Sequence, residues 1–210
     1  MATPIRDGGE TYAPPRSQRS RYAEPVHYQL KITLQDVDPP IWRRVLVPSD
    51  FTLFDLHRVI QIVMGWEDCH LHDFSIKRQR YALPDIVDSD QEGDESETRL
   101  CDVVRPRSKF LYQYDFGDGW MHDLVVEKAV HDVAAAGPFC VDGERAGPPE
   151  DSGGPWGYQV KLEALANPHD EESEELREWI GNDFDAELFE RDSVNAQLHD
   201  SFGRLRKRRG

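Results

Sequence analysis

Hydrophobic residues change their spacing along this 210-residue chain, and that change restricts the fold more than any other feature. In residues 26–36, Tyr28, Leu30, Ile32 and Leu34 alternate with polar residues, as in a half-buried strand. From residue 158 onward, apolar residues recur at helical spacing instead. Strands first and helices last predict an α+β fold, a single domain whose antiparallel or mixed sheet is covered by helices and whose C-terminal part is helical.

The expected elements follow from the same patterns. Pro39 and Pro40 separate strands at 26–36 and 41–48, which predicts a hairpin. Thr52 is a candidate helix N-cap and Gly65 a stop signal, so we expect a helix between them, with His57 and Arg58 on a solvated or interface face without a chemical role. The remaining predictions are a strand at 70–78, two strands at 109–116 and 120–130, a long loop at 131–157, and helices at 158–166, 171–180 and within 185–202.

Composition sets the expected boundaries of the domain. Residues 1–24 are rich in Pro, Gly, Ser and Arg and predict a flexible arm, followed by the α+β domain at 25–202. Residues 84–98 hold seven acidic residues among fifteen, which favours a mobile, solvated loop. Residues 203–210 form a basic tail that we expect to be disordered.

The net charge of −15 is unevenly distributed. Residues 1–21 carry +2 and the tail +5, which leaves about −22 on residues 22–203. Such an acidic body argues against broad binding to a phosphate backbone. A protein or nucleic-acid complex is a candidate partner for the tail, through Arg204, Arg206, Lys207, Arg208 and Arg209, although a solvated charge run is the more common role of such a segment.

The sequence contains no sign of a membrane span or a secretory signal. Its first residues are polar, and no apolar run approaches the length that a membrane helix needs. Cys69, Cys101 and Cys140 are odd in number and have no CxxC spacing, which predicts a reducing, cytoplasmic environment.

Two short motifs concentrate polar chemistry. In HLHD, His70 and His72 lie two positions apart, so on a strand they project from one face, as two ligands of one metal ion or a pair of acid–base groups would. An exposed polar face of an edge strand is the alternative. In YDFGDGWMHDL, residues 114–124, Asp115, Asp118 and His122 surround a turn whose Gly117 and Gly119 are expected to adopt positive φ. Here the alternative is a hairpin in which Trp120 is core.

The letters DFG in the second motif do not indicate a protein kinase. A kinase requires a glycine-rich loop, a strand lysine and an HRD-type loop before its DFG, and none precedes Phe116.

A third motif, CVDGERAGPPEDSGGPWGY at residues 140–158, contains Arg145, a candidate clamp for an anion, and the paired acids Glu150 and Asp151. A loop this rich in Gly and Pro is costly to order unless packing fixes it, although a flexible surface loop is the alternative.

Together the motifs predict a candidate polar site and a candidate metal site. The polar residues are Asp115, Asp118, Trp120, Arg145, Glu150 and Asp151, and the metal ligands are His70, His72 and His122. Mixed imidazole and carboxylate ligands suit Zn, Mn, Ni or Fe better than Ca. No standard ligand signature such as HExxH is present.

The combination of stretches resembles the plasmid pRiA4b ORF-3-like family. The matching pieces are YQLKITLQDVDPPIWRRVLVP, LFDLHRVIQIVMGW, HLHDF, YQYDFGDGWMHDLVVEK, the 140–158 motif and FDAELFERDSVNAQL, in this order over roughly residues 25–200. The resemblance implies a single α+β domain and an accessory role in plasmids or insertion sequences, with a resolvase-like label on some members. A serine recombinase needs an activated serine among arginines and a basic DNA-binding module, and the acidic body offers neither pattern.

Two functions remain after these exclusions. The favoured one is a binding or interaction module associated with plasmid or mobile-element biology, whose acidic surface and basic ends engage a protein or a nucleic-acid-bound complex. The alternative is a metal-dependent, hydrolase-like enzyme that uses the His, Asp and Glu residues above. Whether the protein is an enzyme is left open by the sequence.

Overall fold

A computed structural model describes residues 26–84, 92–131, 133, 137–167, 171–181 and 183–203. The predicted N-terminal arm, residues 85–91 of the predicted acidic loop, and Arg204, Arg206, Lys207, Arg208 and Arg209 of the tail lie outside the described residues. Within them, no helix has the length and apolar content to cross a membrane.

The fold is α+β, as the change of hydrophobic spacing predicts. Its elements in chain order are β1 (His27–Leu34), β2 (Trp42–Pro48), α1 (Leu53–Met64), β3 (His72–Ile76), β4 (Gln79–Ala82), β5 (Gly93–Asp94), α2 (Leu100–Val103), β6 (Lys109–Tyr114), β7 (Trp120–Val130), β8 (Phe139–Glu144), α3 (Gly154–Ala166), α4 (Glu171–Ile180) and α5 (Arg191–Phe202).

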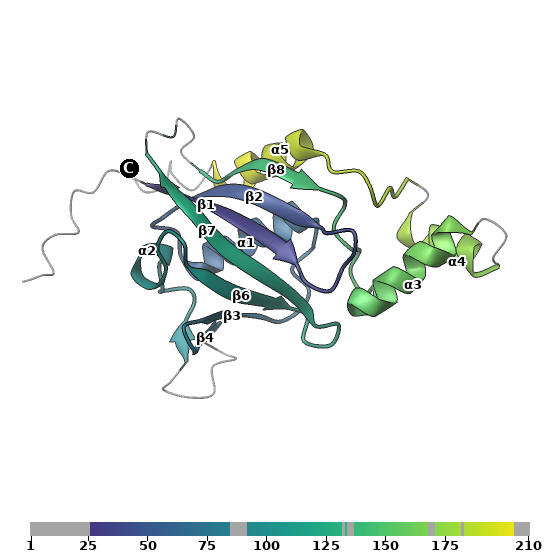
Figure 1. Cartoon of the computed structure of the whole chain (residues 1–210), viewed down its shortest axis with the longest axis horizontal. Helices are drawn as coiled ribbons and strands as arrows, with labels where there is room; N and C mark the ends of the chain where they lie inside the picture. The colour runs from purple at the N-terminus through teal and green to yellow at the C-terminus, as the bar shows by residue number, and fades with distance from the viewer. Residues whose placement is uncertain are drawn as a thin grey trace, which may run out of the picture.

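The strands form one mixed sheet in the order β5-β4-β3-β6-β7-β1-β2-β8. Every pair is antiparallel except β4 with β5. Figure 1 shows α1 behind the sheet with α5 near it, while α3 and α4 extend to the side. The core lies between α1 and the sheet, where the alternate residues Leu30 and Ile32 of β1 are fully buried.

Helix α1 begins and ends as its sequence predicts. The Thr52 side chain accepts a hydrogen bond from Asp55 N and the Asp55 carboxylate accepts one from Thr52 N, a capping box. Gly65 ends the helix in the left-handed conformation at φ 85°. The solvated face expected at His57 is wrong: this side chain is fully buried, because its two ring nitrogens bond to Tyr112 Oη and Asp68 Oδ1, each at 2.8 Å.

The segment expected as one long loop, 131–157, contains strand β8 and the start of helix α3. Strand β8 pairs with β2, with Cys140 opposite Val45, and α3 begins at Gly154 rather than at residue 158. Cys140 is the only residue of β8 that is buried. An edge strand with one buried side chain has little alternation, which explains why its sequence resembles a loop.

The solvated acidic loop predicted at 84–98 is wrong for its last part. Residues 93–94 form β5, and the Glu95 side chain is fully buried, with its Oε1 2.8 Å from His72 Nε2. A hydrogen bond to a buried imidazole offsets the free-energy cost of burying this carboxylate. The composition of the segment does not reveal such a partner.

The β6–β7 connection is a tight turn built by Asp115. Asp115 and Gly119 have positive φ, 52° and 71°, whereas Gly117, predicted to do so, does not. Asp115 tolerates this conformation because its Oδ1 accepts hydrogen bonds from Gly117 N at 2.9 Å and Asp118 N at 3.3 Å. The same carboxylate therefore has only its second oxygen, Oδ2, directed elsewhere.

His122 of β7 lies in the core and gives a pH-dependent prediction. Burial lowers its pKa to about 3. Because this folded-state value is below the unfolded value of about 6.5, protons favour the unfolded chain, and stability present above pH 6.5 is lost as the pH falls toward 3. We expect His122 to contribute a slope of about 1.4 kcal/mol per pH unit over this window.

Urea unfolding of wild type and His122→Leu at several pH values between 7 and 5 measures this slope. The variant should show a shallower dependence by that amount, whereas His199→Gln, which changes an exposed imidazole, should keep the wild-type slope. Equal slopes in the wild type and His122→Leu would contradict the burial of a neutral His122.

Candidate functional site

Three segments that are distant in sequence meet at one end of the sheet. His70 precedes β3 and Asp115 follows β6, and these strands are antiparallel neighbours, with Asp115 N bonded to Leu71 O at 2.9 Å. The loop before α3 joins them, because Gly153 N donates to Asp118 Oδ2 at 2.8 Å. A Cβ on Gly154 would lie 2.3 Å from the Asp118 carbonyl oxygen, so this approach requires glycine.

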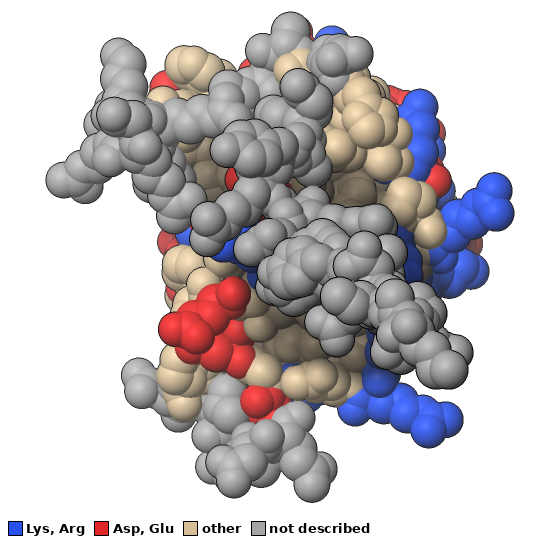
Figure 2. Space-filling view, turned by 90° about the vertical axis from the view of Figure 1, so that its left-hand side faces the viewer, with Lys and Arg blue, Asp and Glu red and all other residues tan. Residues whose placement is uncertain are grey.

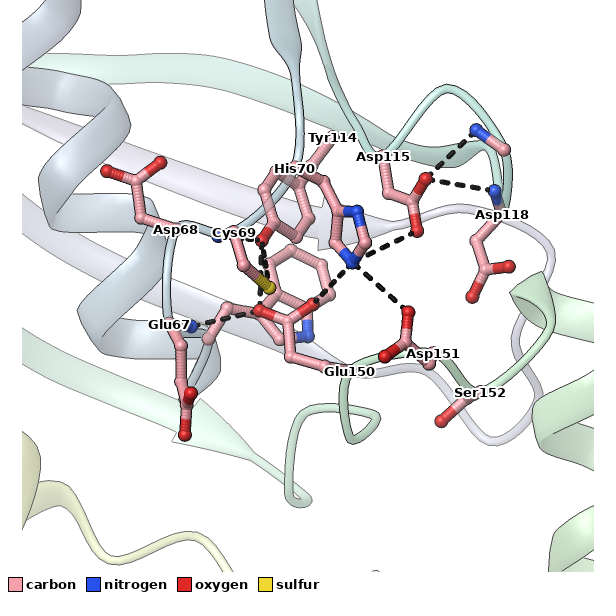
Figure 3. Close-up of polar contacts among 12 residues, drawn as sticks. Glu67, Asp68, Cys69, His70, Tyr114, Asp115, Asp118, Glu150, Asp151 and Ser152 are labelled. Atoms are coloured by element: carbon pink, nitrogen blue, oxygen red, sulfur yellow. Dashed lines mark hydrogen bonds and ion pairs between the residues drawn. The ribbon is translucent and has the colours of Figure 1, made fainter.

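His70 is the centre of the resulting cluster (Figure 3). Its Nε2 lies 3.7 Å from Asp115 Oδ2, 3.8 Å from Glu150 Oε2 and 3.2 Å from Asp151 Oδ1. Nε2 itself is inaccessible to solvent and has no hydrogen-bond partner. Glu150 is mostly buried, whereas the Asp151 side chain is 74% exposed, so the cluster opens to solvent on the Asp151 side.

Two of these carboxylates are held by one oxygen and directed at His70 by the other. Asp115 uses Oδ1 within its own turn. Glu150 Oε1 accepts from Glu67 N and from Tyr114 Oη, each at 2.9 Å, while its Oε2 is buried and has no hydrogen-bond partner. Anchoring that fixes one oxygen and frees the second is the pattern that orients carboxylate ligands around metal ions.

The distances fit a cation between these groups. Four ligand atoms at the corners of a tetrahedron, each about 2.0–2.2 Å from a zinc ion, are separated from one another by about 3.3–3.6 Å. The three distances from His70 Nε2, 3.2–3.8 Å, lie close to this range, but Glu150 forms its close group with His70 and Cys69 rather than with Asp115 or Asp151. His70, Asp115 and Asp151 each offer a ligand atom within 4.8 Å of the other two.

Tyr114 orients Glu150, and its contribution can be measured. Burial, and then its bond to Glu150, raises the pKa of Tyr114, so the hydroxyl stays protonated and donates a hydrogen bond to the carboxylate. We expect Tyr114→Phe to weaken metal binding about 10-fold to 100-fold, the range known for partners that hold a ligand. Tyr81→Phe, which removes a hydroxyl bonded to Gln79 Oε1, is the matched control.

Isothermal titration of both tyrosine variants with zinc makes the comparison. A change in affinity for Tyr81→Phe as large as that for Tyr114→Phe would contradict the orienting role. So would an unaltered affinity in Tyr114→Phe.

Cys69 also lies beside His70 and Glu150, although the sequence motifs did not indicate it as a site residue. Its Sγ lies 3.8 Å from Tyr114 Oη, and it forms a second group of close ligand atoms with His70 and Glu150. Desolvation raises the pKa of its thiol, so without an ion the sulfur stays protonated. The only available signal was its position next to His70 in the sequence.

His72 and His122 are not brought to His70. His72 bonds to Glu95, and its ring is stacked on that of His57, with centroids 3.4 Å apart and an interplanar angle of 1°. His122 packs at 5.3 Å from the ring of Trp66. Lone pairs of two parallel imidazoles point in parallel planes, so the stacked rings of His57 and His72 do not converge on one ion.

The other predicted site residues have structural contacts. Trp120 is fully buried against Trp66 and Tyr158. Arg145 donates to Pro39 O at 2.8 Å and to Glu187 Oε1 at 2.6 Å, and thereby ties the β1–β2 connection to the loop before α5. Asp118 joins the β6–β7 turn to the loop of Glu150, as described above. The cluster around His70 therefore contains four of the nine predicted site residues: His70, Asp115, Glu150 and Asp151.

Comparisons with known proteins give matches that cover similar parts of the chain. A family model described as "Plasmid pRiA4b ORF-3-like protein" matches residues 26–193, which include all four clustered residues. The chain is similar to "Uncharacterized protein y4hQ" of Sinorhizobium fredii, with 39% identity over 175 residues, covering 82% of this chain and 90% of that protein.

A solved structure extends the likeness to the fold. It is a protein of unknown function from Methanosarcina mazei Go1, MM3350, with a TM-score of 0.76 and 37% sequence identity. The match covers 82% of this chain and 99% of that one.

Proposed function

This chain belongs to the plasmid pRiA4b ORF-3-like family, and from the geometry of its site we propose that it is a binding module that holds one divalent transition-metal ion. The ligands are His70 Nε2, Asp115 Oδ2 and Asp151 Oδ1, whose atoms lie within 4.8 Å of one another, and Glu150 Oε2, which would join them as the side chains draw in around the ion. One imidazole with three carboxylates suits Zn, Mn, Fe or Ni.

One observation carries this proposal. His70 Nε2 is buried, makes no hydrogen bond, and faces three carboxylate oxygens at 3.2–3.8 Å. Most buried polar atoms in folded proteins have a hydrogen-bond partner, so an unsatisfied nitrogen that faces three carboxylates points to a cation or a proton between them. A proton can serve only one of the three oxygens at a time, whereas a metal ion satisfies all of them.

The ion would have a role in holding the molecule together. Asp115 belongs to the β6–β7 turn, Glu150 to the loop before α3, and His70 to the start of β3, so one ion would crosslink three segments. Binding to the folded state alone stabilises it by about 2.7 kcal/mol when the free ion is at 100 times its dissociation constant. Chelation should lower the free energy of unfolding correspondingly.

A second candidate, metal-assisted hydrolysis, is favoured by the exposure of Asp151. Its side chain is 74% exposed, so the ion would face solvent on that side and could bind a water molecule. A metal ion lowers the pKa of such a water and makes hydroxide available near neutral pH. Metal-dependent turnover of p-nitrophenyl acetate or p-nitrophenyl phosphate that disappears in Asp151→Ala would favour this candidate over binding alone.

We further propose a cellular setting and a partner for the module. The family description names a plasmid, which supports a role in plasmid or mobile-element biology. Cys69, Cys101 and Cys140 are all free thiols, which supports a reducing compartment such as the cytoplasm. The acidic composition of the body supports a basic protein rather than bare nucleic acid as its macromolecular partner.

The metal proposal is tested with untagged, full-length protein. After exhaustive chelation, the protein is titrated calorimetrically with Zn²⁺, Mn²⁺, Ni²⁺ and Fe²⁺ separately, with Mg²⁺ and Ca²⁺ for comparison. We expect one equivalent of a transition metal to bind, more tightly than Mg²⁺ or Ca²⁺. The absence of stoichiometric binding for every transition metal would overturn the proposal.

A further inference from the structure

Helices α3 and α4 form a hairpin that projects from the rest of the molecule (Figure 1). The two helices pack mainly against each other, and no strand makes a comparable contact with either. Few of their described side chains are buried: Tyr158 on α3 and Ser173 on α4. The hairpin therefore has no core of its own beyond the contact between its helices.

Large apolar side chains are exposed on both helices. Trp156 is 80% exposed, Val160 is 43% exposed and Trp179 is 49% exposed. Trp156 and Val160 are four residues apart, so they lie on one face of α3. Helices of 13 and 10 residues are marginal in water unless an apolar face is packed. Tyr158 and Leu162 of α3 pack on the core, whereas Trp156, Val160 and Trp179 face solvent.

The charges around these residues are acidic. Glu163 on α3 and Glu174, Glu175 and Glu178 on α4 are exposed, and Glu163 lies on the same face as Trp156 and Val160. The two described cations of the hairpin are engaged within it. Lys161 Nζ lies 5.3 Å from the ring centroid of Trp179 and donates to Ser152 O, and Arg177 donates to Ser173 Oγ and Leu165 O.

We propose that the α3–α4 hairpin is the docking surface for a basic protein segment, one that carries arginine or lysine beside apolar side chains. Exposed tryptophan attracts guanidinium and ammonium groups through its ring face, and the surrounding carboxylates add charge complementarity. The same carboxylates repel phosphates, so nucleic acid does not fit this surface. The proposal does not depend on the metal site, because none of its residues is a ligand.

A second copy of the chain is the competing occupant. The end of the molecule opposite the hairpin displays Lys and Arg side chains gathered along one edge, with Asp and Glu at another (Figure 2). Head-to-tail association through that basic edge would cover the hairpin without a separate partner. The test must therefore distinguish self-association from binding of a basic segment.

The experiment uses the full-length protein and a fluorescein-labelled synthetic peptide of arginine and leucine residues. A peptide with glutamate in place of arginine is the charge control. Binding is followed by fluorescence anisotropy at two salt concentrations. The variants are Trp156→Ala and the double change Glu174→Lys with Glu175→Lys. Matched controls elsewhere are Phe139→Ala on β8 and Asp102→Lys on α2, both at exposed positions.

We expect the basic peptide to bind saturably and more weakly at high salt, while the glutamate peptide does not bind. Trp156→Ala and the double variant should each raise the dissociation constant about tenfold, as loss of a central aromatic or charged contact does. Circular dichroism of each variant verifies that it remains folded. The two controls should bind like the wild type.

Three results would overturn the proposal. The first is no saturable binding of the basic peptide, and the second is an equal loss in the Phe139→Ala and Asp102→Lys controls. The third is sedimentation that shows a dimer abolished by Trp156→Ala, because a second copy would then be the occupant.

Discussion

Replacement of His70 by alanine should abolish stoichiometric metal binding. His70 supplies the only nitrogen among the four proposed ligands, and the three carboxylates would be left to hold the ion alone. A partner that merely orients a ligand is worth about 10-fold to 100-fold in affinity, so loss of a ligand itself should cost more than about 100-fold. Isothermal titration with zinc or manganese measures the effect directly.

The matched control for this variant is His199→Ala. His199 is on α5, with 83% of its side chain exposed, so its removal should leave the affinity as in the wild type. Metal-free His70→Ala should also be folded, because Nε2 makes no hydrogen bond that the variant would lose. Retention of one tight equivalent in folded His70→Ala would show that the ion binds elsewhere.

Trp120→Ala should be strongly destabilising. Trp120 is fully buried, with its ring centroid 6.1 Å from that of Trp66 and 6.4 Å from that of Tyr158. Truncation of a buried tryptophan or phenylalanine to alanine costs about 3–5 kcal/mol, because apolar contact is lost and a cavity remains. Chemical denaturation of the metal-free protein measures the difference in the free energy of unfolding.

Trp156→Ala is the matched control, because it makes the same substitution at an exposed position. Trp156 is 80% exposed, and surface substitutions of this kind usually change stability by less than about 0.5 kcal/mol. A small loss for Trp120→Ala, comparable with that for Trp156→Ala, would contradict the core position of Trp120. Trp120 would then again be a candidate binding residue.

The parts of the fold that local patterns determine could be predicted from the sequence. The alternation in 26–36 and the signals at Thr52 and Gly65 predicted β1 and α1, since each depends on residues close in sequence. Strand β8 was not predicted, because only Cys140 of its residues is buried. Its existence depends on pairing with β2, which is a long-range contact.

The candidate site could be predicted only as a set of residue types. HLHD, YDFGDGW and PPED contain all four clustered residues, but which of their side chains meet depends on the register of β3 with β6. That register places Asp115 beside His70, whereas His72 is paired with Glu95. The partner Glu95 lies in a stretch whose composition indicated solvent exposure, so His72 could not be separated from His70 beforehand.

The supporting roles of Tyr114 and Asp115 could not be predicted from the sequence, because they depend on side-chain hydrogen bonds. Tyr114 alternates with its neighbours as any core strand residue does, and only the fold shows its hydroxyl 2.9 Å from Glu150 Oε1. Asp115 adopts positive φ in place of the expected Gly117, since its carboxylate bonds to its own turn. Both features arise from side-chain hydrogen bonds that hydrophobic spacing does not encode.

The central claim is that one transition-metal ion binds between His70 and three carboxylates. Crystals of the metal-loaded protein, with diffraction data collected on both sides of the absorption edge of the bound metal, test it most directly. We predict one strong anomalous peak about 2.0–2.2 Å from His70 Nε2 and from oxygens of Asp115 and Asp151. A metal-loaded crystal with no peak at His70, or with its strongest peak elsewhere, would contradict the claim.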